Sequence, residues 1–205
     1  MTQAKPRPKF QTIEEYIAYE GAEEDLYELA EGQLIPVTSE PRPNSRISLW
    51  LAMQFAQIFG IDNVCHKDTE IEVRKKSAST KKPSTRKPDV MVLGDALVEA
   101  LESMPKGVIP KSMPAPLLVI EVVSPGEENE LRDYNDKRLE YAAWGIPEYW
   151  IIDPGFSEIR VLELSAGKYE TMSIYQGRDR VRSNLEQLTK FDATVEQILS
   201  AGKLG

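Results

Sequence analysis

Residues 117–123 read Leu-Leu-Val-Ile-Glu-Val-Val, an apolar run with one carboxylate, Glu121, near its centre. Apolar residues at both even and odd positions are typical of a central strand that is covered on two faces. An ionised carboxylate in such a strand costs several kcal/mol unless a cation or dense hydrogen bonding compensates. The run therefore predicts a buried strand and a compensating group beside Glu121.

A second acid, Asp89, begins another apolar strand at residues 88–93, which read Pro-Asp-Val-Met-Val-Leu. Successive side chains of a strand alternate faces, so Asp89 can share the face of Glu121 if the two strands pair. Two close carboxylates repel each other in a low-dielectric site, and Mg²⁺ turns that repulsion into coordination. The two strands predict a Mg²⁺ site, in which Mn²⁺ can substitute, suited to phosphodiester hydrolysis.

A helix over residues 130–144 follows the Glu121 strand. Asp133, Lys137 and Tyr141 are spaced four residues apart and form one row on it. Lys137 lies on the flank of the apolar face, from which its amine can reach over the end of the strand. An ordinary surface ion pair with Asp133 is the alternative, but the preceding buried glutamate favours a role in the site. The apolar face comprises Leu131, Tyr134, Tyr141, Ala142 and Gly145.

The remaining segments place the chain in the mixed α/β class, with one central sheet, helices on its faces and antiparallel hairpins. Thr12 is an N-cap candidate, and Glu31-Gly32 is a two-residue turn signal. The proline-rich segment 94–116 carries no assignment. The expected helices are residues 12–19, 44–59, 130–144 and 195–199, and the expected strands are residues 27–30, 33–37, 69–74, 89–93, 117–123, 148–153, 159–164 and 169–175.

The length of 205 residues is sufficient for one domain with a substantial core. We expect a disordered tail over residues 1–9 and a single domain over residues 10–205. No apolar run approaches the ~20 residues needed to cross a bilayer, so no membrane association is expected. The single cysteine and the lack of an apolar signal at the N-terminus indicate a cytoplasmic protein.

Positive charge is concentrated in one segment, although the net charge is −8. Residues 74–87 read RKKSASTKKPSTRK, with seven basic residues and no acid. Phosphate contacts need lysine and arginine, so this expected flexible loop just before Asp89 is a candidate DNA-contact segment. A solvated loop without a partner is the alternative. The candidate contacts are Arg74, Lys75, Lys76, Lys81, Lys82, Arg86 and Lys87.

As a set, these motifs resemble the Uma-type restriction endonucleases, within the restriction-endonuclease-like superfamily that has a Pro-Asp and an Asp/Glu-x-Lys signature. The resemblance covers roughly residues 10–200. It rests on the hairpin residues 27–29, 31–32 and 34–35, on Pro88-Asp89, on residues 118–125, on the Asp133, Lys137 and Tyr141 row, and on residues 145–153.

The resemblance implies a restriction-endonuclease-like fold and a DNA substrate. It implies that Asp89, Glu121 and the backbone carbonyl of Val122 bind the metal. It implies that Lys137 orients the attacking water and stabilises phosphate charge, while Asp133 holds Lys137. It also implies a homodimer that addresses two DNA strands.

Two features depart from the family pattern. The superfamily's lysine usually stands two residues after the second acid, where this chain has Val123, so its role passes to Lys137. After the Ser-Pro that ends the strand, relatives carry hydroxyl and often basic residues, whereas this chain has Glu127, Glu128 and Glu130. Acids beside a phosphate-binding cleft repel DNA, which weighs against DNA binding and turnover.

Two functions therefore stay open. The acid pair and Lys137 favour a Mg²⁺-dependent DNA endonuclease, whereas the three glutamates and the net acidity favour a nucleic-acid-binding or protein-interaction module that keeps the fold without turnover. Glu28 is a further candidate acid, with a surface position on the hairpin as the alternative.

Other residue types are weaker candidates. Trp144, Tyr149 and Trp150 are candidates for base stacking, although aromatic residues around a buried strand usually fill the core. Cys65-His66 supplies only two of the about four ligands of a structural zinc site. Neither group competes with the acid pair as the centre of a site.

Overall fold

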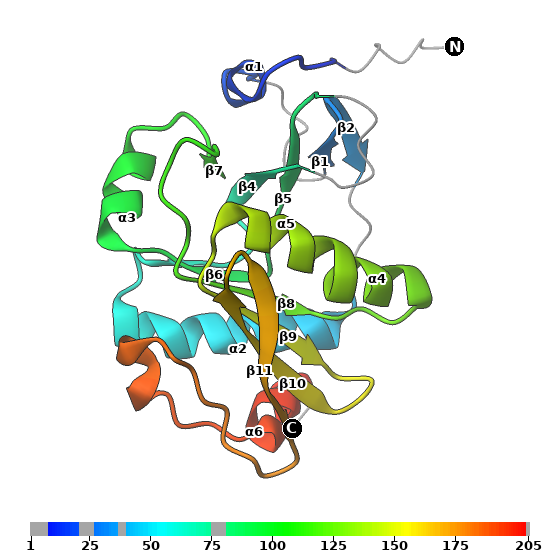
Figure 1. Cartoon of the computed structure of the whole chain (residues 1–205), viewed down its shortest axis with the longest axis vertical. Helices are drawn as coiled ribbons and strands as arrows, with labels where there is room; N and C mark the ends of the chain where they lie inside the picture. The colour runs from blue at the N-terminus through cyan, green and yellow to red at the C-terminus, as the bar shows by residue number, and fades with distance from the viewer. Residues whose placement is uncertain (1–7, 21–26, 37–39, 75–80, 204–205) are drawn as a thin grey trace.

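The structure, a computed structural model, describes residues 8–20, 27–36, 40–74 and 81–203. Within these ranges, the centre is a six-stranded sheet with the order β11-β10-β9-β8-β6-β3 (Figure 1). β8 (Leu118–Val122) runs parallel to β9 (Glu148–Asp153), and the other neighbouring strands are antiparallel. The remaining strands are β3 (Val64–Cys65), β6 (Val90–Val92), β10 (Glu158–Ser165) and β11 (Lys168–Gln176).

A smaller sheet and a hairpin lie beside the main sheet. The small sheet has the order β5-β4-β7, and the hairpin pairs β1 with β2. The Glu31-Gly32 turn has positive φ angles of 49° and 73°, which suit a two-residue hairpin turn. A Cβ at Gly32 would lie 2.1 Å from the Phe10 carbonyl oxygen, so the turn requires glycine. The strands are β1 (Tyr27–Ala30), β2 (Gln33–Pro36), β4 (Glu70–Val73), β5 (Ser84–Arg86) and β7 (Val108–Ile109).

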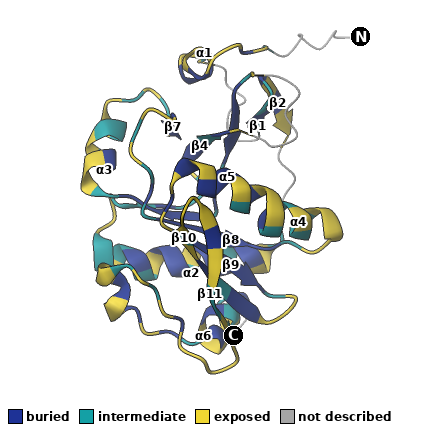
Figure 2. Ribbon diagram, in the orientation of Figure 1, coloured by how far each residue is buried: buried dark blue, intermediate teal, exposed yellow. Residues whose placement is uncertain are grey.

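Helices cover both faces of the main sheet, which explains why β8 is apolar at even and odd positions. α2 (Arg42–Phe59) packs Ile47, Leu51 and Phe55 against the face that includes Ile120 and Trp150. α5 (Lys137–Trp144) covers the opposite face, which carries Val119 and Tyr149. β8 and β9 are buried along their whole length (Figure 2). Trp144, Tyr149 and Trp150 are all buried in these cores, as the packing alternative predicted. The other helices are α1 (Ile13–Ile17), α3 (Asp95–Glu102), α4 (Glu127–Leu131), the 3-10 turn η3 (Glu186–Lys190) and α6 (Val195–Ser200).

The helix expected over residues 130–144 contains an irregular turn. Helical structure begins at Glu127 and includes a π-helical turn, η2 (Arg132–Asp136), before α5. A π turn adds a residue to the helical repeat and changes the phase of the residues before it. The prediction that Leu131 shares the apolar face of Tyr141 is therefore wrong, because Leu131 is 52% exposed and Tyr141 is fully buried.

Three other expectations need adjustment. α2 begins at Arg42, earlier than the expected Asn44 or Ser45, and α3 and β7 occupy the unassigned segment 94–116. Residues 1–7 of the expected tail lie outside the described residues, whereas Lys9 forms a β-bridge with Gln33. No helix in the described ranges is long and apolar enough to span a membrane.

The prediction of a flexible loop over residues 74–87 is wrong for the C-terminal end of that segment. Residues 84–86 form the buried strand β5, in which the Ser84 and Thr85 hydroxyls accept hydrogen bonds from the backbone N–H groups of Glu31 and Leu29. Polar side chains that suggested a solvated loop are instead paired with the hairpin. Lys75 and Lys76 lie outside the described residues.

Candidate functional site

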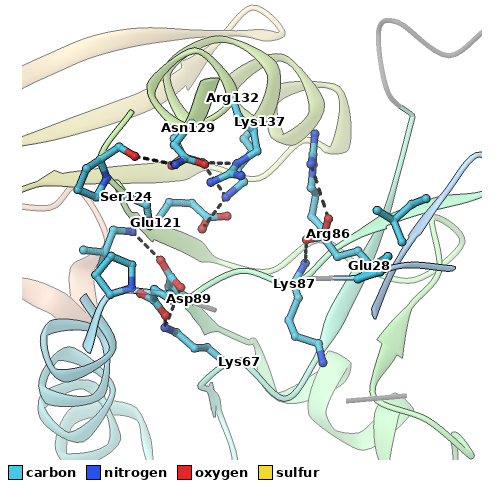
Figure 3. A pocket seen from close by; sticks show the side chains of 17 residues that line it. Glu28, Lys67, Arg86, Lys87, Asp89, Glu121, Ser124, Asn129, Arg132 and Lys137 are labelled. Carbon is cyan, nitrogen blue, oxygen red and sulfur yellow. Dashed lines mark hydrogen bonds and ion pairs between the residues drawn. The ribbon is translucent and has the colours of Figure 1, made fainter. Parts of the chain in front are cut away.

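Five residues predicted to form the site line one cavity of about 590 Å³ (Figure 3). They are the three expected metal ligands, the expected catalytic lysine and the aspartate expected to hold that lysine. The cavity lies between the β1–β2 hairpin, the start of α2 and the π turn η2. Sequence positions more than forty residues apart therefore meet at one end of the central strands. The five residues are Asp89, Glu121, Val122, Asp133 and Lys137.

Asp89 stands just before β6 and faces the edge of β8. The β6–β8 ladder ends at the Val90–Ile120 pair, which leaves the backbone N–H of Val122 to donate to Asp89 Oδ2 at 2.7 Å. The N–H and C=O of one residue project from the same edge of a strand, so the Val122 carbonyl also faces this edge. Asn44 Nδ2 approaches that carbonyl oxygen at 3.4 Å.

Glu121 is 2% exposed and lies on the face of β8 that α5 covers. Tyr141 donates its hydroxyl to Glu121 Oε1 at 2.5 Å, and Lys137 Nζ lies 2.8 Å from Glu121 Oε2. Burial raises the pKa of Glu121 to about 7; Lys137 opposes that shift, and the Asp89 and Asp133 carboxylates add to it. The compensating group expected beside the buried carboxylate is thus an ammonium and a phenol.

Asp133 in the π turn and Lys137 at the start of α5 both line the cavity. Lys137 Nζ lies 2.7 Å from Asp133 Oδ1, and the two side chains are 8% and 2% exposed for lysine and aspartate. Burial lowers the pKa of Lys137, but Glu121 and Asp133 outweigh it and hold the pKa above its ordinary value. The pair is a buried part of the cavity wall, which excludes the alternative of a surface ion pair.

The donors of this cavity suit Mg²⁺. No group of three or more His, Cys, Asp and Glu side chains in the described part of the chain converges as a metal cluster. Mg²⁺ does not require three side-chain ligands, because one or two carboxylates with water and substrate phosphate are its usual protein environment. Asp89, Glu121 and the Val122 carbonyl, which line the cavity, are the groups that would supply that set.

Several cavity residues carried no signal in the sequence. Lys67, in the loop before β4, places Nζ 3.2 Å from Asp89 Oδ1 and also pairs with Glu40, which precedes α2. Arg132 places Nε 3.2 Å from Asp133 Oδ1. Position next to Asp133 could have drawn attention to Arg132, but no local pattern identifies Lys67 or Glu40.

The basic residues predicted to contact DNA are dispersed. Arg86 is buried in β5, where its Nε and Nη2 bond the two oxygens of Glu140 at 2.7 and 3.0 Å. Lys87 lines the cavity, while Arg74 and Lys81 are exposed outside it. Lys82 is half-buried and does not line the cavity either. Arg86 is therefore part of the cavity wall and not of an exposed loop.

Of the other four acidic residues singled out in the sequence, one lines the cavity and three do not. Glu28 lines the cavity and accepts a hydrogen bond from the Lys87 backbone N–H at 3.4 Å. Glu127 and Glu128 are exposed, Glu130 is half-buried, and none of the three lines the cavity. The α4 residue that does is Asn129. The glutamates expected to repel DNA therefore lie outside the cavity.

Cys65 and His66 do not form a reactive pair in this structure. Burial raises the pKa of the Cys65 thiol to about 11, which keeps it protonated at neutral pH. His66 Nε2 lies 3.1 Å from Ser48 Oγ, and that hydroxyl donates to the Ser45 carbonyl within α2. A hydroxyl that donates to its own helix is not poised as a nucleophile for His66.

The mixed sheet, with an acid at each of two adjacent central strands and a lysine on the helix that follows, defines a nuclease-like fold. The chain belongs to the Uma2 family, described as "Putative restriction endonuclease", which matches residues 13–196. This confirms the family resemblance and the expected fold class.

Among solved structures, the chain is similar to a putative nuclease belonging to DUF820 from Anabaena variabilis ATCC 29413. The TM-score is 0.65, the sequence identity is 14%, and the match covers 94% of this chain and 99% of that chain. At this identity the likeness shows the fold alone. No curated protein matches the chain.

Proposed function

We propose that this chain is a Mg²⁺-dependent endonuclease that hydrolyses phosphodiester bonds of DNA. The observation that supports it best is the convergence of Asp89, Glu121 and Lys137, from two strands and a helix, on one cavity. Membership of a restriction-endonuclease family supports DNA as the substrate.

Each residue has a role that follows from its contacts. Asp89, Glu121 and the Val122 carbonyl would hold Mg²⁺, which when bound supplies Lewis acidity toward a phosphate oxygen. The Tyr141 hydroxyl fixes the orientation of Glu121. Asp133 holds the Lys137 ammonium in the cavity, where it can orient a water molecule and stabilise negative charge on the phosphate.

The cavity also carries cations that can hold the DNA backbone. Lys67, Lys87 and Arg132 line it together with the acids, and we assign phosphate contacts to Lys87 and Arg132. The exposed Arg74 and Lys81 would extend this contact away from the cavity. A homodimer, with one cavity for each strand, completes the proposal.

Plasmid cleavage tests the proposal directly. Asp89→Asn and Glu121→Gln should each lower Mg²⁺-dependent nicking of supercoiled DNA by about a hundredfold or more, because each removes a charged metal ligand. Glu163→Gln is the matched control, since Glu163 is an exposed strand carboxylate of β10 outside the cavity. Nicking at the wild-type rate by Asp89→Asn and Glu121→Gln, purified in the same way, would refute the assignment.

A binding module without turnover is the second candidate. It is favoured by the pairing of Asp89 with Lys67 and of Glu121 with Lys137, which compensates both acids without a metal. Salt-dependent DNA binding in EDTA, with no cleavage at any Mg²⁺ or Mn²⁺ concentration, would support this function over the first.

A further inference from the structure

The two proposed ligand carboxylates are held in the same manner. One oxygen of each accepts a hydrogen bond from a fixed donor, the Val122 N–H for Asp89 and the Tyr141 hydroxyl for Glu121. The other oxygen of each pairs with an ammonium, Lys67 for Asp89 and Lys137 for Glu121. Both oxygens that remain for a metal therefore already face a lysine.

Each lysine also has a second acid that is outside the proposed ligand set. Lys137 contacts Asp133, and Lys67 contacts Glu40. The two halves thus repeat one arrangement of ligand acid, lysine and outer acid. They differ in burial, because the Lys67 side chain is 24% exposed and that of Lys137 is 8% exposed. The half at Asp89 has more room to rearrange.

The backbone at Lys67 supports a functional reason for this residue. Its φ is +57°, a conformation that lysine rarely adopts. Among the described residues, the other non-glycine positions with positive φ are Glu31, Ser157 and Ala166, which lie in turns between paired strands. Of these four described residues, Lys67 is the one that lines the cavity. Strained backbone of this kind tends to occur at functional sites.

We propose that Lys67 is the internal counter-ion of Asp89 and that a divalent cation breaks this ion pair, leaving the ammonium on Glu40 alone. This inference rests on the proposed metal site. In the metal-free protein, Lys67 neutralises Asp89 and competes with the incoming cation. After displacement, Glu40 keeps the ammonium in the cavity wall, so Lys67 stays near a bound phosphate. Lys67 is thus a positioning residue that tunes the affinity for the metal.

Mn²⁺ binding to the DNA-free protein, followed by the EPR signal of free Mn²⁺, tests the exchange without any cleavage step. Lys67→Asn should bind Mn²⁺ roughly fivefold more tightly, because it removes a competing ion pair. Asparagine also tolerates positive φ, so the variant adds no backbone strain, and thermal unfolding checks that it is folded. Lys67→Arg keeps the charge and should bind within about twofold of wild type. Lys87→Asn is the matched control for the loss of one positive charge, since Lys87 also lines the cavity whereas the ion pair of Asp89 is with Lys67.

Glu40 supplies the second arm of the test. Glu40→Gln should weaken Mn²⁺ binding by roughly threefold, because Lys67 then remains on Asp89. In the Lys67→Asn background the same change should have no effect, since Glu40 acts through Lys67.

The outcomes separate this inference from the proposed function. Wild-type Mn²⁺ affinity in Lys67→Asn, or an equal gain in Lys87→Asn, would overturn the counter-ion role. Weaker binding by Glu40→Gln in the Lys67→Asn background would overturn the exchange by placing Glu40 on the ion itself. Mn²⁺ binding that does not depend on Asp89 would instead refute the metal site of the proposed function.

Discussion

Helix α5 takes part in two buried glutamate–cation pairs, and only one of them belongs to the proposed reaction centre. Lys137 at its start pairs with Glu121 of β8 and also with Asp133. Glu140, one turn later, pairs with Arg86 of β5. All of these side chains are buried, so burial of charge alone does not distinguish a site from a structural contact.

Geometry makes the distinction. Arg86 bonds both oxygens of Glu140 through two nitrogens, which satisfies the carboxylate with planar, directional hydrogen bonds. Lys137 instead shares one ammonium between Glu121 and Asp133, and Asp133 also pairs with Arg132, so no cation of the described residues bonds both oxygens of Glu121. An arginine that bonds both carboxylate oxygens closes the pair, whereas Glu121 Oε2 is held by a shared ammonium that the proposed metal would replace.

The largest expected effect is on cleavage by Lys137→Met. Loss of the ammonium removes charge stabilisation at the phosphate and should lower single-turnover plasmid cleavage by about a thousandfold. Mn²⁺ binding should persist, because Asp89, Glu121 and the Val122 carbonyl are retained. Lys168→Met, at an exposed lysine of β11, is the control. A cleavage rate within threefold of wild type would show that the two pairs of α5 are both structural.

Arg86→Met should affect stability more than chemistry. It leaves Glu140 buried without its cation, and the unfolding free energy in urea should fall by about 3 kcal/mol. The double variant Arg86→Met with Glu140→Leu should recover most of that loss, since neither charge is then left unpaired. Cleavage per folded molecule should change by less than about fivefold. A double variant no more stable than Arg86→Met would contradict a simple pair.

The sequence predicts the strand that carries Glu121 because its continuous apolar run is a local property, and the four-residue spacing places Lys137 in one row with Asp133. The pairing of the two acid-bearing strands is only a condition of the predicted shared face, and the structure supplies it. The partner of Arg86 stands 54 positions away, and Lys67 reaches Glu40 across 27 positions, so no local pattern reports either contact. The sequence predicts a loop at Ser84 and Thr85 because they are polar. Their hydrogen-bond partners lie in the β1–β2 hairpin, more than fifty positions away, so the sequence near them does not indicate a buried strand.

The smallest expected effect comes from acids that lie near the cavity without lining it. Glu127 and Glu128 are exposed at the start of α4, whereas Asn129 lines the cavity and donates from Nδ2 to the Pro125 carbonyl. At 0.15 M salt, exposed charges are screened beyond about 8 Å. The double variant Glu127→Gln with Glu128→Gln should therefore change DNA affinity by less than about twofold at that salt, and by more at 0.02 M.

Asn129→Asp places a negative charge on the cavity wall, for comparison with the exposed charges of Glu127 and Glu128. One added carboxylate on the wall should weaken DNA binding by about tenfold, more than removal of two exposed ones strengthens it, because a cavity charge is less screened. Fluorescence anisotropy of a labelled duplex in EDTA measures both variants without cleavage. If the double glutamine variant binds DNA tenfold more tightly at 0.15 M salt, the charge of the α4 surface, and not the position of an acid relative to the cavity, governs binding.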